Sequence, residues 1–293
     1  MSESSQSRSS AQVFIAIAIA VALGAFVGWA GSDGSVYWQS WPVFAFCALL
    51  AFVINWVVFL PSAALKTEKF YDLTGGITYI TVTITAVALS PELDLRGKLV
   101  AACVVIWSAR LASFLFRRIS KDGKDGRFDD IKGRPARFLM AWTLQGLWVV
   151  LTAAAALAVI TGQTQKPLGV VGIVGFAIWL IGFLIEVVSD NQKSRFKLDP
   201  ANAGKFIDVG LWSRSRHPNY FGEIVLWVGI AIVAIPVLQG WQYVTLISPV
   251  FVTFLLTKVS GIPLLEQRSD ARWGGQEDYE RYKAETPVLI PKL

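Results

Sequence analysis

The sequence predicts an all-α membrane protein, a polytopic helical bundle with seven or eight transmembrane helices. Three observations support this fold class. Of the 293 residues, 54% are hydrophobic and only 16% are charged, and the mean hydropathy is +0.51. The hydrophobic residues also gather in long runs separated by short polar segments. Because soluble domains carry about 25% charged residues, the composition excludes ordinary soluble, disordered and fibrous proteins.

The apolar runs predict the helices. An uninterrupted run of about 20 residues can cross the hydrocarbon core of a bilayer. Such runs, or slightly shorter ones, cover residues 11–30, 42–60, 76–90, 99–115, 138–160, 168–188, 221–238 and 244–259. The first run is long for a signal-peptide core, so we expect a retained spanning helix; if it is cleaved, seven helices are left. The shortest, 76–90, contains four threonines and is expected to line a cavity or to pack deep in the bundle.

Lysine and arginine predict the orientation. They gather in segments 117–137 and 193–216, whereas segments 31–39, 162–167 and 239–242 are nearly free of them. Cytoplasmic loops carry the excess of positive charge, so we expect the basic segments and both termini on the cytoplasmic side. Segment 91–98, with two cations, is the exception on the outer side. The net charge of +6 then reflects this bias and anionic lipid, with no nucleic-acid partner.

Cysteines and domain organisation add little beyond this. Cys47 and Cys103 lie inside apolar runs and are expected to be small buried residues. The absence of a disulfide pattern and the short serine-rich start suit a bacterial inner membrane. We expect residues 1–40 to form an additional helix and an outer loop, and residues 41–293 to form the main domain. The tail, residues 262–293, is too short for a core of its own and is expected to pack as a lid on the cytoplasmic face.

Polar residues inside the apolar runs, or at their edges, are the first candidates for function. A charged side chain at the centre of a spanning helix costs about 2.5–3.5 kcal/mol on insertion, so its presence indicates a role. The ionisable candidates are Asp72, Arg110, Glu186, Asp190, Glu223 and Lys258; the uncharged ones are Asn55, Gln145 and Asn219.

The densest polar stretch is residues 213–223, Ser-Arg-Ser-Arg-His-Pro-Asn-Tyr-Phe-Gly-Glu. Pro218 suits the first turn of a helix, which places Asn219 and Glu223 on one face. A helix N-terminus beside Arg216 and His217 favours an anionic ligand. Alternatively, the arginines flank the membrane and touch lipid phosphates, which leaves the Asn219 and Glu223 pair unexplained. With a single histidine in the chain, we expect no metal.

A second pair, Glu186 and Asp190, has the same spacing of four residues at the predicted end of the preceding helix. The connection that follows, residues 191–212, carries Lys193, Lys197 and Lys205. Carboxylates followed by a basic loop suit a ligand with both hydrogen-bond donors and phosphates, such as a nucleotide. The alternative is a solvated helix end with an ordinary basic loop.

The third cluster, in residues 66–76, places Tyr71 and Asp72 just before a glycine pair that opens a helix. A carboxylate that orients a tyrosine hydroxyl makes a plausible proton donor. Alternatively, Asp72 caps the helix and Tyr71 anchors it at the membrane surface. Arg110, inside a predicted span, either reaches towards the cytoplasm or pairs with a carboxylate such as Asp72 or Glu186.

The motif Ser-Arg-His-Pro-Asn-Tyr-Phe-Gly-Glu at residues 215–223, followed by an apolar helix, resembles the C-terminal region of the steroid 5-alpha-reductase superfamily. The closest resemblance is to a bacterial branch labelled as a domain of unknown function. It extends from about residue 66 to the C-terminus. Further support comes from Ser-Asp at 189–190, Gly-Leu-Trp at 210–212 and the tail motif that runs from Tyr279 to Pro291.

The resemblance implies an integral-membrane reductase that uses NADPH to reduce a carbon–carbon double bond of a steroid-like, isoprenoid or other lipid taken from the bilayer. It implies catalytic roles for Asp72 and Arg110, to which we add Tyr71. The cofactor-binding residues that it suggests are Asn219 and Glu223 at the nicotinamide, Asp190 and Glu186 near the adenosine, Lys197 and Lys205 at phosphates, with Arg216, His217 and Tyr220 from the same motif.

One departure from the family bears on the substrate. The family's proton-donating tyrosine precedes the arginine by three residues, and Trp107 occupies that position here. An indole does not give up its proton in this role. Either Tyr71 or Tyr79 substitutes for it, or the substrate is not a 3-oxo steroid.

Two other classes of function stay open. Isoprenylcysteine carboxyl methyltransferases also resemble the chain, through Arg-His-Pro at 216–218, Tyr220, Gly222 and the tail. They use S-adenosylmethionine, which has no phosphates, so the basic segment 193–216 favours the reductase. A non-catalytic lipid-binding protein would leave the carboxylates inside the spans without a purpose.

Overall fold

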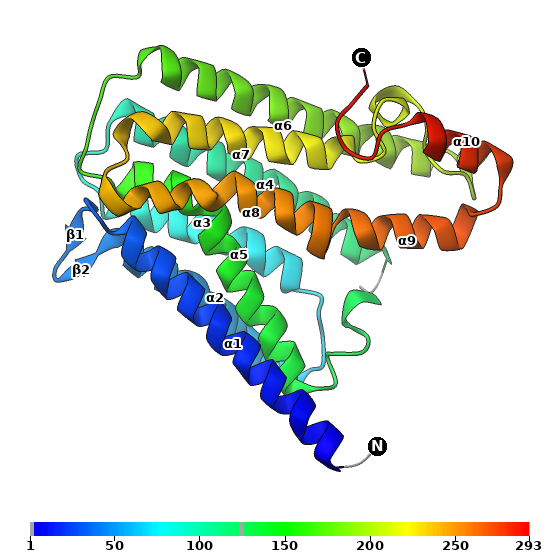
Figure 1. The fold of residues 1–293 in the computed structure, drawn as a ribbon, viewed down its shortest axis with the longest axis horizontal. Helices are drawn as coiled ribbons and strands as arrows, with labels where there is room; N and C mark the ends of the chain where they lie inside the picture. The colour runs from blue at the N-terminus through cyan, green and yellow to red at the C-terminus, as the bar shows by residue number, and fades with distance from the viewer. Residues whose placement is uncertain (1–2, 123–125, 293) are drawn as a thin grey trace. The chain divides into compact units, whose positions relative to one another are not determined.

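The computed structural model describes residues 3–122 and 126–292, and their regular structure is almost entirely helical (Figure 1). Within them, seven helices are long and apolar enough to cross a membrane, which confirms the predicted fold class. The chain forms two compact units. Unit 1 contains residues 1–168 and 234–247, and unit 2 contains residues 169–233 and 248–293.

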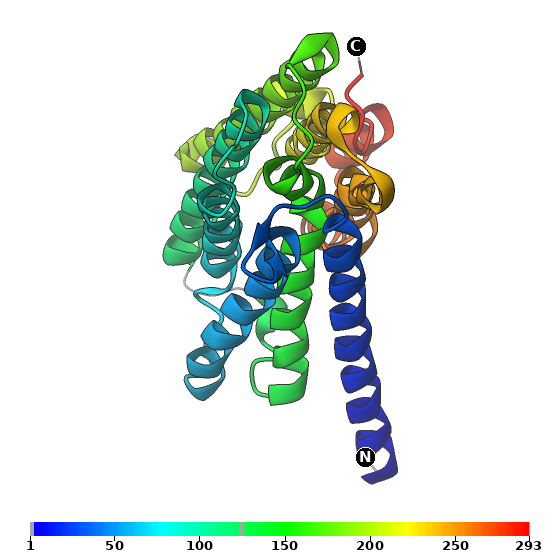
Figure 2. The same cartoon turned by 90° about the vertical axis from the view of Figure 1, so that its left-hand side faces the viewer.

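Unit 1 is built around one buried helix. Its long helices are α1 (Glu3–Gly31), α2 (Val43–Ala64), α3 (Tyr71–Ala88), α4 (Leu95–Asp122) and α5 (Pro135–Thr161). Helix α5 packs against all four others, and Figure 2 shows it between α1 and α2. A hairpin of β1 (Tyr37–Trp38) and β2 (Trp41–Pro42) joins α1 to α2. The short helices η1 (Gly126–Phe128), η4 (Ile235–Val237) and η5 (Gly240–Leu246) complete the unit.

Unit 2 contains the two polar helix segments that the sequence singles out. Its long helices are α6 (Gly169–Leu198) and α7 (Pro218–Ala234), with η2 (Pro200–Asn202) and η3 (Gly210–Ser213) between them. After α7 and the part of the chain that belongs to unit 1 come α8 (Ile247–Phe254), the π-turn η6 (Leu255–Val259), α9 (Ile262–Trp273) and α10 (Glu277–Glu285).

The backbones of α6 and α7 approach closely through glycines. Gly182 faces Gly222, and a Cβ atom placed at Gly182 would lie 2.5 Å from the backbone nitrogen of Leu226. A Cβ at Gly229 would lie 2.5 Å from the backbone nitrogen of Trp179. Small residues allow such close contact between helices in a membrane, where association depends on van der Waals packing. The glycines therefore set the distance at which polar side chains on the two helices meet.

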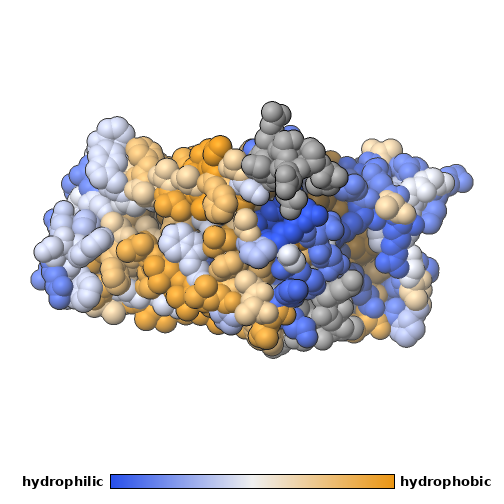
Figure 3. All heavy atoms as spheres, turned by 90° about the horizontal axis from the view of Figure 1, so that it is seen from below, coloured by the Kyte–Doolittle hydropathy of each residue, from blue (hydrophilic) through white to orange (hydrophobic). Residues whose placement is uncertain are grey.

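The outer surfaces of the helices suit a lipid environment. Large apolar side chains are exposed on α1 and α6, among them Phe14, Ile19, Ile173 and Ile181. Figure 3 shows broad hydrophobic areas on one face. A surface of this extent is unusual on soluble monomers, and it is the expected surface of helices that contact acyl chains.

Two predicted helix boundaries are wrong. Helix α3 begins at Tyr71, not at 76, so Tyr71 and Asp72 lie in its first turn and Gly75 and Gly76 lie inside it. The glycines do not break the helix because neighbouring side chains fill their space; a Cβ at Gly76 would lie 2.3 Å from the Cβ of Ala112. No side chain caps this helix, which rules out Asp72 as the N-cap.

Helix α6 continues to Leu198, ten residues beyond its predicted end at 188. Lys193 and Lys197 therefore lie on the helix, and Glu186 and Asp190 lie well before its end. The predicted end at 188 is the point where the sequence stops being apolar. The helix continues beyond it because lysine, arginine and glutamine are good helix formers.

The structure also bears on the predicted span 244–259 and on the predicted domain that contains the first helix. The predicted span 244–259 consists of parts of η5, α8 and η6, within a longer helical stretch, Gly240–Trp273. Helix α1 belongs to the same compact unit as α2–α5, and the division of the chain into domains at residue 40 stays a prediction.

We predict that Gly182→Leu destabilises unit 2. The new side chain would overlap backbone atoms of α7 that cannot move away, and overpacking of this kind costs about 1–3 kcal/mol. The measurement is the thermal unfolding midpoint of the detergent-purified protein. Gly28→Ala is the control, because a Cβ there meets Ala48 at an ordinary 3.4 Å. Equal midpoints for the Gly182 variant and the wild type would contradict close packing of α6 and α7.

Candidate active site

Asp190 of α6 and Asn219 of α7 form a polar pair inside unit 2. The side-chain nitrogen of Asn219 donates to Oδ1 of Asp190 at 3.2 Å, and Asp190 is 5% exposed. The Oδ1 atom of Asn219 is buried and has no hydrogen-bond partner among the described residues. An unpaired buried acceptor is costly, so this oxygen is suited to a donor on a ligand.

His217, just before α7, is held by the tail of the chain. Its Nε2 lies 2.8 Å from Oε1 of Glu266 on α9, and the other carboxylate oxygen of Glu266 lies 3.0 Å from Nη1 of Arg216. Since a carboxylate accepts, we assign the proton of the neutral ring to Nε2. The Nδ1 atom is then a buried acceptor, again without a hydrogen-bond partner in the described part of the chain. Tyr220 stacks on the imidazole, with ring centroids 5.7 Å apart.

Burial is the main cause of a lowered pKa at His217. The positive charges of Lys193 and Arg216 also lower this pKa, whereas the hydrogen bond with Glu266 raises it. The net effect favours the neutral imidazole at pH 7.

The segment before α7 is fixed from both sides. The indole nitrogen of Trp212 donates to the backbone oxygen of Ser189 at 2.9 Å, and Lys193 lies over the Trp212 ring at 4.2 Å. From the tail, Tyr282 donates to the backbone oxygen of Trp212 at 2.7 Å. The backbone nitrogen of Arg216 donates to the carbonyl of Pro287 at 2.9 Å. The tail thus packs against this segment.

The other predicted cofactor residues lie in unit 2 with different exposure. Glu186 is 2% exposed. Its backbone lies close to α7, because a Cβ placed at Gly222 would lie only 2.6 Å from the Glu186 backbone nitrogen. Glu223 is half-buried on α7, one turn after Asn219. Lys197 and Lys205 are exposed. Their roles at phosphates stay predictions.

The residues predicted to be catalytic belong to unit 1. Tyr71 and Asp72 line a cavity of about 130 Å³ between α3, α4 and α5. Tyr79 and Trp107 also line it, in edge-to-face contact at 5.2 Å. The Tyr71 hydroxyl donates to the backbone oxygen of Ala141 at 2.9 Å.

Arg110, one turn before Phe114 on α4, is half-buried. Its guanidinium lies 5.5 Å from the centroid of the Phe114 ring, a cation–π contact within its own helix. The predicted pairing with Asp72 or Glu186 stays a prediction.

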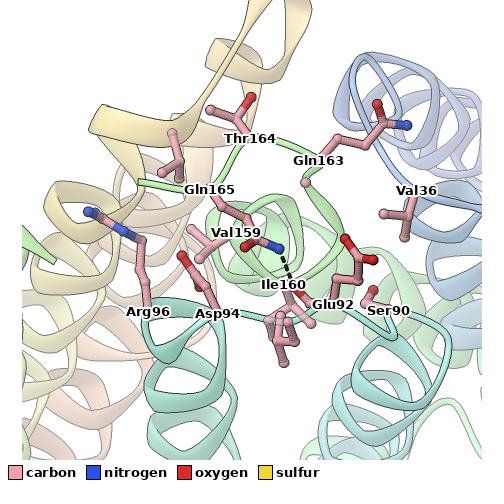
Figure 4. A pocket seen from close by; sticks show the side chains of 13 residues that line it. Val36, Ser90, Glu92, Asp94, Arg96, Val159, Ile160, Gln163, Thr164 and Gln165 are labelled. Carbon is pink, nitrogen blue, oxygen red and sulfur yellow. Dashed lines mark hydrogen bonds between the residues drawn. The ribbon is translucent and has the colours of Figure 1, made fainter. Parts of the chain in front are cut away.

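The loops of unit 1 carry two further polar groups. Between α4 and α5, Lys132 forms an ion pair of 3.1 Å with Glu68, which is 4% exposed. The Glu68 hydrogen bond raises the Lys132 pKa. Figure 4 shows another cavity, of about 120 Å³, where Gln165 donates to the backbone oxygen of Glu92. There Arg96 donates to the backbone oxygen of Pro167 at 2.8 Å, so these contacts join the α3–α4 and α5–α6 connections.

Sequence reasoning did not single out Glu266 or Trp212 as site residues. Glu266 lies in a charged tail with no apolar run around it. The free-energy cost of placing a charge inside a membrane helix therefore does not single it out. Only its contact with Arg216 and His217 shows its place. Trp212 was part of a motif, but its role in fixing Ser189 depends on a contact 23 residues away in the chain.

Comparison with known proteins places this helical membrane protein in the steroid 5-alpha-reductase-like superfamily. A family model described as "Protein of unknown function (DUF1295)" matches residues 58–286, and the chain belongs to this family. The resemblance found in the sequence is thereby confirmed. No solved structure matches the chain.

Several curated relatives, among them one from Rattus norvegicus and one from Bos taurus, are named "3-oxo-5-alpha-steroid 4-dehydrogenase 1". The protein from Rattus norvegicus is 31% identical over 117 residues, 40% of each chain. The one from Bos taurus is 36% identical over 69 residues, 24% of this chain and 26% of its own. A "Probable O-methyltransferase ustE" from Ustilaginoidea virens is 35% identical over 66 residues, 22% and 23% of the two chains. The chain thus matches about two fifths, or less, of these relatives' lengths.

We predict that the protein loses stability as the pH falls below 6.5, and that His217→Gln removes part of this loss. The folded protein lowers the His217 pKa, so the unfolded chain binds the proton more tightly and acid favours unfolding. One proton gives a slope of at most about 1.4 kcal/mol per pH unit. Glutamine keeps a donor towards Glu266 but does not titrate.

The measurement is the unfolding midpoint of both proteins between pH 5 and pH 8. Because His217 is the single histidine in the sequence, the difference between the two curves reports on it alone. Parallel curves would show that burial does not lower this pKa.

Proposed function

We propose that the protein is an integral-membrane reductase that uses NADPH to reduce a carbon–carbon double bond of a lipid. The observation that supports this most directly is the buried pair Asp190 and Asn219, which leaves an unpaired acceptor in a unit rich in basic residues. The relatives named 3-oxo-5-alpha-steroid 4-dehydrogenase 1 support the same class of reaction.

The chemistry of unit 2 fits a pyridine nucleotide. The nicotinamide carboxamide has N–H donors, and the buried acceptors of Asn219 and His217 suit such donors. The exposed Lys197 and Lys205, with Arg216 near the start of α7, suit phosphates. When bound, NADPH supplies a hydride. In this proposal Asp190 orients the amide of Asn219, and Glu266 orients the ring of His217.

Reduction of the double bond requires a proton as well as a hydride. In this proposal Asp72 and Tyr71 of unit 1 supply the proton. Both line the cavity between α3, α4 and α5, and Asp72 is half-buried in the first turn of α3. Tyr79 lines the same cavity. Trp107 also lines this cavity, and we assign it a role in shaping the cavity, because its indole is not an acid at neutral pH.

A methyltransferase is the second candidate, because one relative carries that name. S-adenosylmethionine has an amine and a carboxylate but no phosphate, so it would leave the exposed lysines of unit 2 without a counterpart. This difference makes cofactor binding the deciding experiment.

We predict that NADPH, and not S-adenosylmethionine, raises the thermal unfolding midpoint of the purified protein. A ligand at a hundredfold excess over its dissociation constant stabilises by about 2.7 kcal/mol. Asn219→Ala and Glu223→Ala should reduce the shift while the protein stays folded. The exposed Asn191, next to Asp190, provides the control Asn191→Ala.

Wild-type NADPH affinity in both variants would refute their assignment. Stabilisation by S-adenosylmethionine alone would replace the reductase by the methyltransferase, and a response to neither would favour a non-catalytic lipid-binding protein.

We predict that Asp72→Asn and Tyr71→Phe leave NADPH binding intact and slow reduction. Loss of a general acid or of the residue that orients it costs about 10²–10⁴-fold in rate. NADPH oxidation in the presence of unsaturated lipid ketones and alcohols measures the rate. Tyr37→Phe, at a tyrosine that is 60% exposed, is the control. Unchanged turnover in both variants would mean that another group carries the proton.

A further inference from the structure

One end of unit 1 carries a group of exposed aromatic side chains. They come from three segments that are separate in the sequence: the end of α1, the β1–β2 hairpin and η5. The hairpin lies beyond the ends of α1 and α2 (Figure 1). Each residue of this group, the aromatic cluster, is 40–60% exposed, and its members are Trp29, Tyr37, Trp38, Trp41, Trp241 and Tyr243.

Contacts within unit 1 hold the three segments together. The rings of Trp29 and Trp241 have centroids 5.2 Å apart, and the backbone nitrogen of Trp241 donates to the Asp33 carboxylate at 2.8 Å. In the hairpin, Trp38 and Trp41 are directly paired residues, so their side chains lie on the same face. The aromatic cluster therefore belongs to one fixed end of the unit.

The hairpin is also fixed to α5, the buried helix of the unit. The backbone nitrogen of Val36 donates to the carbonyl of Thr161, the last residue of α5, at 2.7 Å. The backbone nitrogen of Gln163 donates to the carbonyl of Gly34 at 2.8 Å, and its side chain donates to the backbone oxygen of Ser35 at 2.9 Å. The level of the hairpin in a membrane is therefore also the level of this end of α5.

The surface of this end is apolar with polar tips and almost no charge. Residues 31–42 and 234–247 contain no lysine or arginine, and Asp33 is their single acidic residue. Indole and phenol side chains combine an apolar ring with one polar group. Such side chains are enriched where the hydrocarbon of a bilayer meets its headgroups. The surface is also continuous with the lipid-facing side of α1, since Phe26 lies 5.9 Å from Trp29 between ring centroids.

The length of α5 matches this placement. Its 27 residues extend over about 40 Å, and a bilayer with its headgroup regions is about 40–45 Å thick. At the other end of α5, Arg134 and Arg137 belong to the basic segment 117–137. Cytoplasmic loops carry such basic segments. A helix with the basic segment at one end and the aromatic cluster at the other thus reaches from one membrane surface to the opposite one.

We infer that the aromatic cluster anchors the protein among the headgroups and glycerol esters of the phospholipid leaflet opposite the basic segment. Through the hydrogen bonds between the hairpin and the end of α5, this anchor fixes the depth of unit 1 in the bilayer. The inference is independent of the proposed reaction, because no residue of the aromatic cluster lines the cavity between α3, α4 and α5.

The first test measures the depth of the hairpin. Ser40, exposed at its tip, is changed to cysteine and given a nitroxide label; the native Cys47 and Cys103 are buried. The protein is placed in phosphatidylcholine vesicles, and collisions of the label with oxygen and with a water-soluble nickel complex report its depth. We expect the label about 15–22 Å from the bilayer centre, which is the headgroup region.

A label at Ile19→Cys provides the reference, since Ile19 is 55% exposed and lies about 18 Å along α1 from Gly31. It should lie near the bilayer centre. A Ser40 label that meets the nickel complex as often as a label in bulk water would overturn the inference in favour of a soluble partner. A Ser40 label as deep as the reference would overturn it as well. Because the vesicles contain no other protein, the expected depth excludes a partner protein as the occupant.

The second test removes two indoles together, with Trp41→Leu and Trp241→Leu, which keep apolar side chains. The Ser40 label is then compared in thin and thick phosphatidylcholine bilayers. With the aromatic cluster intact, the label should keep its distance from the lipid phosphates. In the double variant this distance should change by about 2 Å or more, because leucine has no preference for the headgroup region.

Phe14→Leu is the matched control, because Phe14 is a 57% exposed aromatic residue of α1 outside the aromatic cluster. Its label should behave as in the wild type. The thermal unfolding midpoints in detergent should be equal for all three proteins, which separates anchoring from folding. If the double variant does not fold, the depth of the Ser40 label in the wild-type background decides. A folded double variant whose label keeps its distance from the phosphates in both bilayers would overturn the anchor.

Discussion

Polar groups placed inside apolar helices must find their partners within the protein, and this constraint organises both units. A bilayer offers no water to satisfy an amide or a carboxylate. The pairing of Asp190 with Asn219 and that of Gln145 with Tyr71 both follow from it. In each case one atom of the amide is satisfied by the chain, and the other is left as a buried acceptor. In unit 2, this acceptor belongs to the site that we propose for the cofactor.

Close helix packing makes these pairings possible. In unit 2, Gly182 and Gly222 let the backbones of α6 and α7 approach until short side chains can meet across the interface. In unit 1, Gly75 makes the space into which the amide of Gln145 fits. A methyl group at either place would push the partners apart, so the glycines position the polar groups without touching a ligand themselves.

The tail contributes charge compensation as well as packing. Glu266 on α9 contacts both Arg216 and His217, so one carboxylate joins two groups at the start of α7. Burial together with the neighbouring Lys193 and Arg216 keeps His217 neutral, with a lowered pKa. A neutral imidazole offers a lone pair at Nδ1, which a protonated ring would not. The electrostatics of the tail thus support the proposed role of this end of α7.

The sequence by itself determined the helical membrane fold, the family and the positions of the two polar helix faces, because hydropathy and a spacing of four residues are local properties. Asp190 and Asn219 could be singled out separately, since each is a polar residue at the edge of an apolar run. That they contact one another depends on how α6 packs on α7, and no local pattern reports this. Glu266 lies in a segment of ordinary charge, so only the tertiary structure shows its place beside His217. The orientation of the Gln145 amide was likewise decided by packing, because an amide can point either way until a carbonyl such as that of Tyr71 fixes its nitrogen.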